Sequence, residues 1–336
     1  MKRLAFILAV PIILVVILLS FGLVWWSQNS KPISSNNETS RFVIPKGYGA
    51  SQTAQKLFEQ KLIKSTLAFK VYVQIRGFSE NIQAGEYDLS QNSSLPKLVD
   101  TLLKGPTSVW ITIPEGLRRE EIGIRFAQSL IKDKNQQEIF LNDFLQNTKG
   151  KEGFLFPDTY LFPRDMSGEK VANFMKTTFD NRISAFAKDI SAGNLGLNQI
   201  MTLASLIERE AKGTEERPII AGILIKRTEA GWPLQVDAAV QYAVATNKCR
   251  VSINNDCNWW PILTKEDLEV NSRFNTYKYP GFPPAPVSNP GLSSIKAAVF
   301  PQDSPYWFYL HDQDGNIHFA KTIEEHNENI RTYLGK

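Results

Sequence analysis

Apolar and polar residues are distributed differently at the N-terminus and in the rest of the chain. From Leu4 to Trp26 the sequence carries no charged residue, whereas later segments mix the two kinds of residue at regular intervals. A bilayer core about 30 Å thick requires roughly 20 apolar residues of helix, and this run is long enough. We therefore predict a transmembrane helix over residues 7–26 behind a cytoplasmic stub, 1–6. A cleaved signal peptide is the alternative, although the run exceeds a usual signal core and no small-x-small cleavage site follows it.

The charges beside this segment indicate its orientation. Lys2 and Arg3 precede it, whereas the stretch SQNSKPISSNNETS that follows contains a single lysine. The positive-inside rule then places the N-terminus in the cytoplasm. We expect a single-pass protein of the cytoplasmic (inner) membrane with a periplasmic or extracytoplasmic body. Residues 27–40, rich in Ser and Asn, are expected to form a flexible tether.

The next segment, residues 41–106, has the pattern of a small α+β unit. RFVIP and AGEYDL alternate as strands do, and both Ala54–Leu62 and Ser65–Ile75 have helical spacing of apolar residues. LPKLVDTLLKG predicts a helix that ends at Gly105. With its Pro-Lys-Gly turn, this small α/β pattern resembles a LysM-like subdomain, a module that binds glycans containing N-acetylglucosamine. Whether it binds glycan here is left open by the residues themselves.

Residues 107–336 predict a larger, mixed α+β domain. VWITI is expected to be a strand, and WFYLHD and IHFA flank a turn and form a hairpin. The connector Glu152–Asp165 contains too many prolines and aromatic residues for regular structure. Helices are expected at residues 117–130, 140–146, 170–188, 198–211, 215–231, 236–245, 293–299 and 322–333. The fold class predicted for the whole chain is α+β.

Composition excludes several classes of function. The 336 residues are 43% hydrophobic and 21% charged, which is typical of a globular protein. The net charge of +4 is spread along the chain, so no nucleic-acid surface is indicated. The three histidines and two cysteines lack metal-ligand spacing, and there is no Gly-rich phosphate loop, GxSxG, SxxK or HExxH motif. We expect neither a metal nor a cofactor.

Cys249 and Cys257 lie eight residues apart in the polar stretch TNKCRVSINNDCNWW. In an oxidising compartment such a pair can close a short loop, so we predict a structural disulfide. Two free, buried thiols are the alternative.

Carboxylates remain as candidates for chemistry, and the segment MTLASLIEREAKG holds two of them. On a helix Glu208 and Glu210 are about 200° apart and cannot face the same narrow cleft. Glu210 lies over Leu206 and Ile207, and apolar surroundings raise the pKa of a carboxyl group toward neutrality. Glu210 is therefore the candidate general acid. A solvent-exposed charge at a helix edge is the alternative that periodicity alone favours.

A set of motifs resembles one family of enzymes. In order they are PEGLRREEI, EGFLFPDTY, TLASLIEREA, RPIIAGILIKR, GWPLQVDAAVQY, FNTYKYPGFPPAPVSNPG, SIKAA and HDQDGNIHFAKTIEEHN. From about Arg41 to Leu334 the chain is similar to the endolytic murein transglycosylase family, also called YceG-like proteins. Residues 107–336 would then be the YceG-like catalytic domain. The family's catalytic glutamate is the second one of the IERE-type motif, which falls on Glu210.

The resemblance implies a peptidoglycan lytic transglycosylase, a lyase that cuts the bond between N-acetylmuramic acid and N-acetylglucosamine within glycan strands. Glu210 would act as general acid and then base, leaving a 1,6-anhydro end, and the enzyme would terminate or trim nascent strands in cell-wall biogenesis. Peptidoglycan would be the substrate, and cell-wall synthases (penicillin-binding proteins) the partners. Residues that could position the sugar follow the GWP turn and precede the proline loop: Gln235, Asp237, Asn275, Thr276 and Tyr277. Glu152 and Asp158 could line the groove.

Some positions depart from the family pattern, and two other functions stay open. LQVDAAV stands where LQ-Ser/Thr-DPTV is usual, the loop around Cys249 looks like an addition, and Ala285 stands where glycine is common. A hydrolytic muramidase could use Glu210 with Asp237 as its second carboxylate. A membrane-tethered peptidoglycan-binding scaffold would need no catalysis at all.

Overall fold

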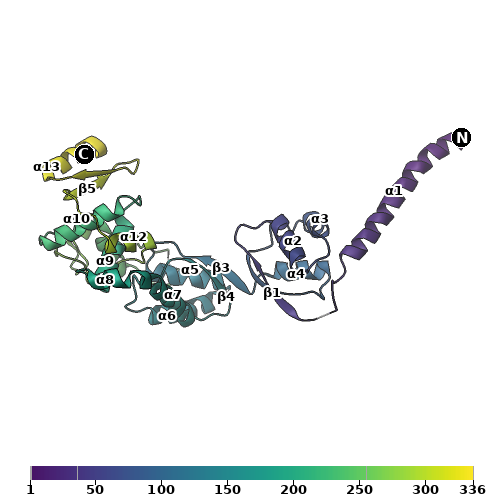
Figure 1. Ribbon diagram of the computed structural model, residues 1–336, viewed down its shortest axis with the longest axis horizontal. Coiled ribbons are helices and arrows are strands. Elements are labelled where there is room, and N and C mark those ends of the chain that lie inside the picture. The colour runs from purple at the N-terminus through teal and green to yellow at the C-terminus, as the bar shows by residue number, and fades with distance from the viewer. Residues whose placement is uncertain (1, 36, 255, 336) are drawn as a thin grey trace. The chain divides into compact units, whose positions relative to one another are not determined.

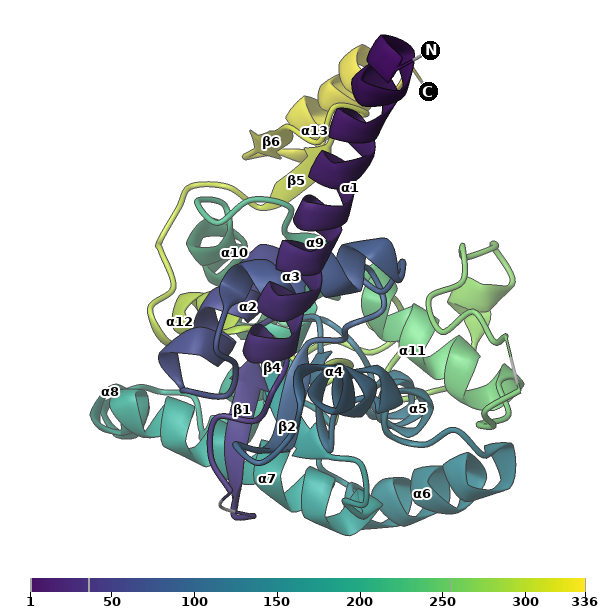
Figure 2. The same cartoon turned by 90° about the vertical axis from the view of Figure 1, so that its right-hand side faces the viewer.

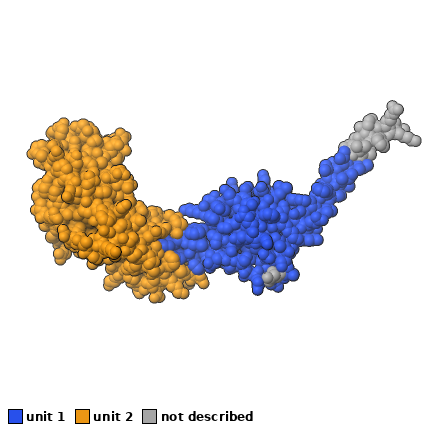
Figure 3. All heavy atoms as spheres, in the orientation of Figure 1, with its two compact units in different colours: residues 1–111, 160–164 blue, residues 112–159, 165–336 orange. Residues whose placement is uncertain are grey.

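The computed structural model combines helices with short strands, which confirms the α+β class (Figure 1). It describes residues 2–35, 37–254 and 256–335, apart from the side chains of residues 2–12. Two compact units are present: unit 1, residues 1–111 and 160–164, and unit 2, residues 112–159 and 165–336 (Figure 3). Residues 107–111 thus belong with unit 1.

The chain begins with helix α1, Lys2–Asn29. Among the residues whose side chains are described, no helix meets the length and apolarity that a bilayer crossing requires. The predicted transmembrane segment also includes residues 7–12, whose side chains are not among those described. The membrane anchor therefore stays a prediction.

Unit 1 is a sheet with three helices beside it (Figure 1). Its strands lie in the order β1 (Thr39–Ile44), β2 (Gly85–Ser90), β3 (Ser108–Thr112) and β4 (Thr159–Pro163), with β1–β2 and β2–β3 antiparallel. The helices are α2 (Ala50–Glu59), α3 (Thr66–Ile75) and α4 (Leu95–Lys104). Phe42 pairs with Tyr87 across β1 and β2, and both rings are buried against Leu57, Phe69 and Leu98 of the helices. This core matches the apolar pattern of the sequence, but it does not test the LysM-like prediction.

Strand β4 lies in the connector that was expected to be irregular, so that prediction was wrong. Its residues pair beside β3, and the Arg164 N–H donates to the Thr107 carbonyl at 3.0 Å. Tyr160 and Phe162, two residues apart, stack on one face with ring centroids 5.3 Å apart. Prolines at residues 157 and 163 hide this short strand, because an edge strand tolerates proline where an inner strand would lose a ladder hydrogen bond.

Unit 2 is mainly helical. Its helices are α5 (Arg119–Leu130), α6 (Lys134–Asn147), α7 (Gly168–Ile183), α8 (Ala187–Ala192), α9 (Leu197–Glu210), α10 (Arg217–Glu229), α11 (Asp237–Lys248), α12 (Leu292–Val299) and α13 (Ile323–Asn329), with single turns at 184–186, 267–269 and 330–334. Helix α9 contacts α10, α11 and α12, and every residue from Ile200 to Ile207 is buried. The hairpin β5 (Phe308–His311) and β6 (Ile317–Ala320) forms as predicted and lies with α13 on the α10 side of the unit (Figure 2).

The proline-rich loop before α12 is fixed to the middle of α9. The Val287 N–H donates to Ser205 Oγ at 3.0 Å, and Ser288 Oγ donates to the Ser205 carbonyl at 3.2 Å. All three residues are fully buried. Because these bonds replace lost water contacts, they set the distance between the loop and the helix.

Candidate active site

Glu210 is the last residue of α9 and marks the point where that helix leaves the core. The helix begins at Leu197 behind the N-cap Gly196, whose N–H donates to Gln199 Oε1 at 3.1 Å. From Ile200 to Ile207 every residue of the helix is buried in unit 2. Glu210 is half-buried there. A carboxylate at a helix C-terminus is also opposed by the helix dipole. Both features favour the neutral form of this side chain.

Glu210 opens onto a cavity of about 380 Å³ in unit 2. The lining comes from α9, α10, α11, the loop at 277, the hairpin and α13. The lining residues are Glu210, Arg227, Gln235, Asp237, Tyr277, Phe308, Tyr309, Ile323 and His326. Five other charged or titratable groups therefore line the same cavity as the candidate acid.

The surroundings of Glu210 raise its pKa to about 7. Desolvation by burial is the largest cause, and the nearby Asp237 charge acts in the same direction. The hydrogen bond from Tyr309 and the charges of Arg227 and Arg209 lower the pKa, but they do not outweigh burial. At neutral pH the carboxyl group is therefore close to half-protonated, as a group that must both give and take a proton should be.

Tyr309 reaches Glu210 from strand β5. Its phenolic O–H donates to Glu210 Oε2 at 2.9 Å. Burial and the Glu210 charge raise the pKa of Tyr309 well above its usual value, so the phenol keeps its proton. Arg227 of α10 secures the hairpin, because its Nε donates to the Trp307 carbonyl at 2.9 Å and its Nη1 to the Leu234 carbonyl at 2.7 Å.

Three of the predicted sugar-positioning residues line the cavity: Gln235, Asp237 and Tyr277. The Tyr277 O–H donates to Asp237 Oδ1 at 2.6 Å. Gln235 adopts φ 55°, a left-handed conformation that is rare for a residue with a side chain. A strained backbone of this kind persists only where surrounding contacts hold it in place. Gln235 stands two residues before the start of α11, and its side chain lines the cavity.

Asn275 and Thr276 are not among the lining residues, and both are buried within the loop. Thr276 Oγ1 accepts from the Val236 N–H at 3.0 Å, and the Thr276 carbonyl accepts from the Gln235 N–H at 3.0 Å. Asn275 Nδ2 donates to the carbonyls of Leu268 and Val270. Thr276 thus fixes the backbone at Gln235 and Val236, and Asn275 fixes the loop that carries Tyr277.

The other candidate carboxylates face elsewhere. Glu208 Oε2 accepts from the Gly291 N–H at 3.0 Å, and Glu208 pairs with Arg217 at 3.6 Å. This agrees with the opposite helix faces expected for Glu208 and Glu210. Glu152 is buried and accepts from Asn289 Nδ2 at 2.7 Å, while Asp158 pairs with Arg182. Neither Glu152 nor Asp158 lines the cavity.

No site residue was predicted in the C-terminal segment, yet this segment lines the cavity. The lining includes Phe308, Tyr309, Ile323 and His326 of this segment, together with Arg227 of α10. One signal was available for Arg227, since it lies on the apolar side of α10 beside Ile223 and Leu224. A charge on a buried face indicates a role beyond solubility. The approach of the hairpin depends on packing between distant segments, which periodicity does not report.

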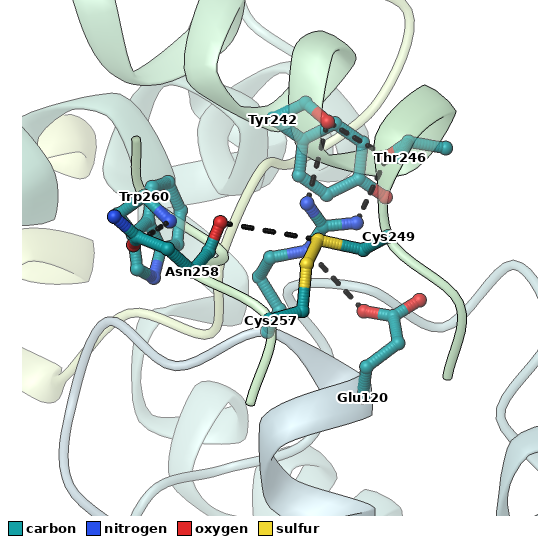
Figure 4. The surroundings of a disulfide bond; sticks show 8 residues. Glu120, Tyr242, Thr246, Cys249, Cys257, Asn258 and Trp260 are labelled. Carbon is teal, nitrogen blue, oxygen red and sulfur yellow. Dashed lines mark hydrogen bonds and ion pairs between the residues drawn. A yellow bond between two sulfur atoms is a disulfide. The ribbon is translucent and has the colours of Figure 1, made fainter. Parts of the chain in front are cut away.

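Cys249 and Cys257 form a disulfide at the end of α11, beside Tyr242, Thr246 and Glu120 (Figure 4). Arg118, whose side chain is only 1% exposed, lies between the Tyr242 ring at 4.0 Å and the Trp259 ring at 4.8 Å. Because Trp259 lies only two residues after Cys257, the disulfide restricts the segment that supplies one of the two rings stacked on Arg118.

The next tryptophan continues this contact toward α9. Trp260 Nε1 donates to Glu121 Oε2 at 3.1 Å, and the Arg209 guanidinium lies 3.8 Å from the Trp260 ring centroid. Arg209 is exposed, and this stacking fixes the direction of its side chain. The disulfide loop therefore orders the residue that precedes Glu210.

Comparisons with known proteins agree with this architecture. Residues 42–332 match the family model described as the YceG-like family. A Bacillus subtilis protein named endolytic murein transglycosylase is 31% identical over 328 residues, which cover 90% of this chain and 88% of the relative. A protein of the same name from Streptococcus pneumoniae is 27% identical over 349 residues, covering 94% of this chain but 62% of the relative. The crystal structure of a putative YceG-like protein from Listeria monocytogenes matches this fold with a TM-score of 0.56 and 30% sequence identity. The match covers 87% of this chain and 99% of the Listeria chain.

Proposed function

Because the chain belongs to the YceG-like family, we propose that it is an endolytic lytic transglycosylase of peptidoglycan with Glu210 as its single acid and base. The substrate is the glycan strand, an alternating polymer of N-acetylmuramic acid and N-acetylglucosamine. The relatives named endolytic murein transglycosylase support the reaction class. The assignment of Glu210, the bond cleaved and the role in ending nascent strands belong to the proposal.

One observation supports the proposal most directly. The half-buried Glu210 carboxyl group has a pKa of about 7, lines a polar cavity and accepts a hydrogen bond from the Tyr309 hydroxyl. A protonated carboxyl can donate its proton to the glycosidic oxygen as the bond between that oxygen and C1 of the muramic acid breaks. The same group, now a carboxylate, can accept the proton of the muramic acid 6-hydroxyl. The 6-oxygen attacks C1 and closes a 1,6-anhydro ring, so no water enters the product.

The other lining residues serve this reaction by position and charge. The fixed Arg227 guanidinium and the Tyr309 hydroxyl stabilise the Glu210 carboxylate after it has lost its proton. The Asp237 charge opposes that carboxylate and so favours proton donation. Gln235 offers an amide to sugar hydroxyls, which fixes the strand in the cavity.

A hydrolytic muramidase is the second candidate, because Asp237 lines the same cavity as Glu210. In that mechanism Asp237 would activate water or form a covalent bond to the sugar. The 2.6 Å hydrogen bond from Tyr277 occupies Asp237 Oδ1, which disfavours attack by that oxygen. The single-carboxylate mechanism needs no such attack.

The proposal includes a location outside the cytoplasm, held by the predicted anchor at residues 7–26. The substrate class requires it, and the Cys249–Cys257 disulfide is typical of an oxidising compartment. Cell-wall synthases in the same membrane would supply the strands.

The proposal is tested by mass spectrometry of fragments released from uncrosslinked glycan strands by the full chain and by its Glu210→Gln and Asp237→Asn variants. We expect anhydro-ended fragments from the wild type, none from Glu210→Gln, and slower release of the same fragments by Asp237→Asn. Reducing ends from the wild type, lost in Asp237→Asn, would establish the muramidase. Strand binding without fragments from any of the three would establish a scaffold.

A further inference from the structure

We propose that His326 donates a hydrogen bond from Nε2 to the acetamido carbonyl of a sugar bound beside Glu210. This inference rests on the proposed function, since it names the chemical group that the same cavity recognises. His326 is used by no step of the mechanism above. Its ring lies on α13, more than one hundred residues after Glu210 in the chain, yet both side chains line one cavity.

The orientation of the imidazole ring is fixed by packing. The His326 ring stacks on Phe308 with centroids 5.2 Å apart and an interplanar angle of 23°. Helix α13, which carries His326, contacts both β5 and β6. The α13 N-terminus is held by Thr322, whose side chain accepts from the Glu325 N–H. A ring fixed in this way presents one edge to the cavity at little entropic cost.

The two ring nitrogens of His326 have different surroundings. In the described part of the chain, Nδ1 is buried and has no hydrogen-bond partner. A buried N–H without an acceptor is more costly than a buried lone pair, which favours the tautomer with the proton on Nε2. Nε2 is then the nitrogen that serves the cavity, and it serves as a donor.

Burial and a neighbouring positive charge keep the His326 ring neutral. Burial is the main cause that lowers the pKa of His326, and the Arg227 charge acts in the same direction. Protonation would place a second N–H at the buried Nδ1 position, again without an acceptor. The ring is therefore a neutral donor at the pH at which Glu210 is half-protonated.

The groups beside His326 match an acetamido group. Arg227 is a second donor beside the cavity: among the described residues its Nε and Nη1 donate to the Trp307 and Leu234 carbonyls, and its guanidinium also lines the cavity. Phe308 and Ile323 add apolar wall on the same side of the cavity. Donors suit the carbonyl oxygen and the apolar wall suits the methyl group. A sugar hydroxyl would use the donors but leave the apolar wall without a partner.

The test compares two glycan substrates and two side chains. Full-length wild type and His326→Phe are assayed on uncrosslinked strands before and after complete de-N-acetylation. Phe keeps the stack on Phe308 and replaces the unpartnered Nδ1 with carbon, so we expect the fold to be retained. On N-acetylated strands we expect His326→Phe to lose about 5- to 10-fold in kcat/KM, and on de-N-acetylated strands less than about 2-fold.

Two controls make the outcome specific. His326→Gln places an amide N–H near the Nε2 position and is expected to recover most of the loss. His318→Phe alters a second histidine of this hairpin region, which pairs with Asp312 and does not line the cavity, so any loss should be equal on both substrates. An equal loss for His326→Phe on both substrates would overturn the proposal.

The same four combinations are repeated as binding measurements in the Glu210→Gln background. Binding does not require cleavage, so it separates this inference from the proposed function. If the wild type cleaves neither substrate, the proposed reaction is wrong, and the binding series still decides His326. A 5- to 10-fold weaker binding of N-acetylated strands alone supports the acetamido contact, at about the strength of one neutral hydrogen bond. Equal weakening for both strands contradicts it.

Discussion

At the scale of single residues, Glu210 is governed by neighbours that act on its pKa in opposite directions. Burial and Asp237 raise the pKa, whereas Tyr309, Arg227 and Arg209 lower it. The result, about 7, lies where one carboxyl group can serve as acid in the first step and base in the second. Helix geometry alone predicted the first of these influences, because it placed Glu210 over Leu206 and Ile207.

The wild-type enzyme should therefore lose activity as Glu210 loses its proton. We expect log(kcat/KM) to be level below pH 7 and to fall with unit slope above it, since free enzyme must carry the proton to begin the reaction. The measurement is the initial rate of fragment release at low substrate across a range of buffers. A wild-type profile that stays level above pH 7 would contradict the assignment of this limb to Glu210.

Tyr309→Phe and Asp237→Asn should move that limb in opposite directions. Tyr309 stabilises the carboxylate through its 2.9 Å hydrogen bond, so its removal raises the pKa of Glu210 and shifts the limb to higher pH. Asp237 destabilises the carboxylate, so its removal lowers the pKa and shifts the limb to lower pH. Both variants also lower the plateau rate. Shifts in the same direction would contradict the electrostatic assignment.

Glu210 should also make the stability of the fold depend on pH. Its pKa is about 7 in the folded protein and 4.5 without the fold, so the native state binds more protons between these values. The stabilising contribution of the protonated form is complete below about pH 4.5 and is lost as pH rises through 7. Relative to wild type, Glu210→Gln should gain about 1–3 kcal/mol of unfolding free energy between pH 5 and 8.

Urea unfolding at several pH values measures this difference. The matched control is Glu215→Gln, which changes an exposed glutamate just beyond α9 and should alter stability by less than about 0.5 kcal/mol at each pH. A difference between Glu210→Gln and wild type that stays constant with pH would contradict the raised pKa.

At the scale of elements, the contact between α9 and the proline-rich loop holds the helix that carries the proposed acid Glu210. Ser205→Ala leaves the buried Val287 N–H without its acceptor, and we expect a loss of about 1–3 kcal/mol in unfolding free energy. Ser191→Ala is the control. Its hydroxyl donates to the Ala187 carbonyl one turn earlier on exposed α8, so a change within about 0.5 kcal/mol is expected. Equal effects would show that the Ser205 contact contributes nothing.

Elements with clear periodicity were predictable, and those defined by pairing were not. The helices α3, α4, α9 and α12 begin and end within about two residues of the predictions because turn and cap residues mark their ends. Strand β4 was missed because its neighbour β3, not its own pattern, makes it a strand. Helix α6 begins six residues earlier than predicted, at Lys134 behind the cap Asp133.

The same distinction applies to the site. Gln235, Asp237 and Tyr277 were accessible to prediction because the motifs that carry them stand out in the sequence. Tyr309 and His326 were not, because each has an ordinary position in a strand or helix and acquires its role only when the C-terminal segment packs beside α10. Asn275 and Thr276 were predicted to position the sugar, but they are buried and hydrogen-bond to the backbone instead. A polar residue in a prominent motif can therefore have a structural role.

At the scale of the whole molecule, the disulfide and the predicted anchor both indicate a location on the outer side of the cytoplasmic membrane. We expect thiol labelling of the protein taken from its native membrane to find Cys249 and Cys257 blocked until a reductant is added. Protease added outside intact spheroplasts should digest the body while cytoplasmic marker proteins survive. Free thiols, or a protected body, would contradict the proposed location.

The central claim for the whole molecule is that cleavage proceeds through Glu210 without water. The most direct measurement is the reaction of full-length enzyme with uncrosslinked strands in water labelled with heavy oxygen, read by mass spectrometry beside Glu210→Gln. We expect the wild type to release unlabelled fragments that are lighter by one water at the muramic acid end than hydrolysis products, and the variant to release none. Fragments that carry the heavy oxygen, or equal cleavage by Glu210→Gln, would contradict it.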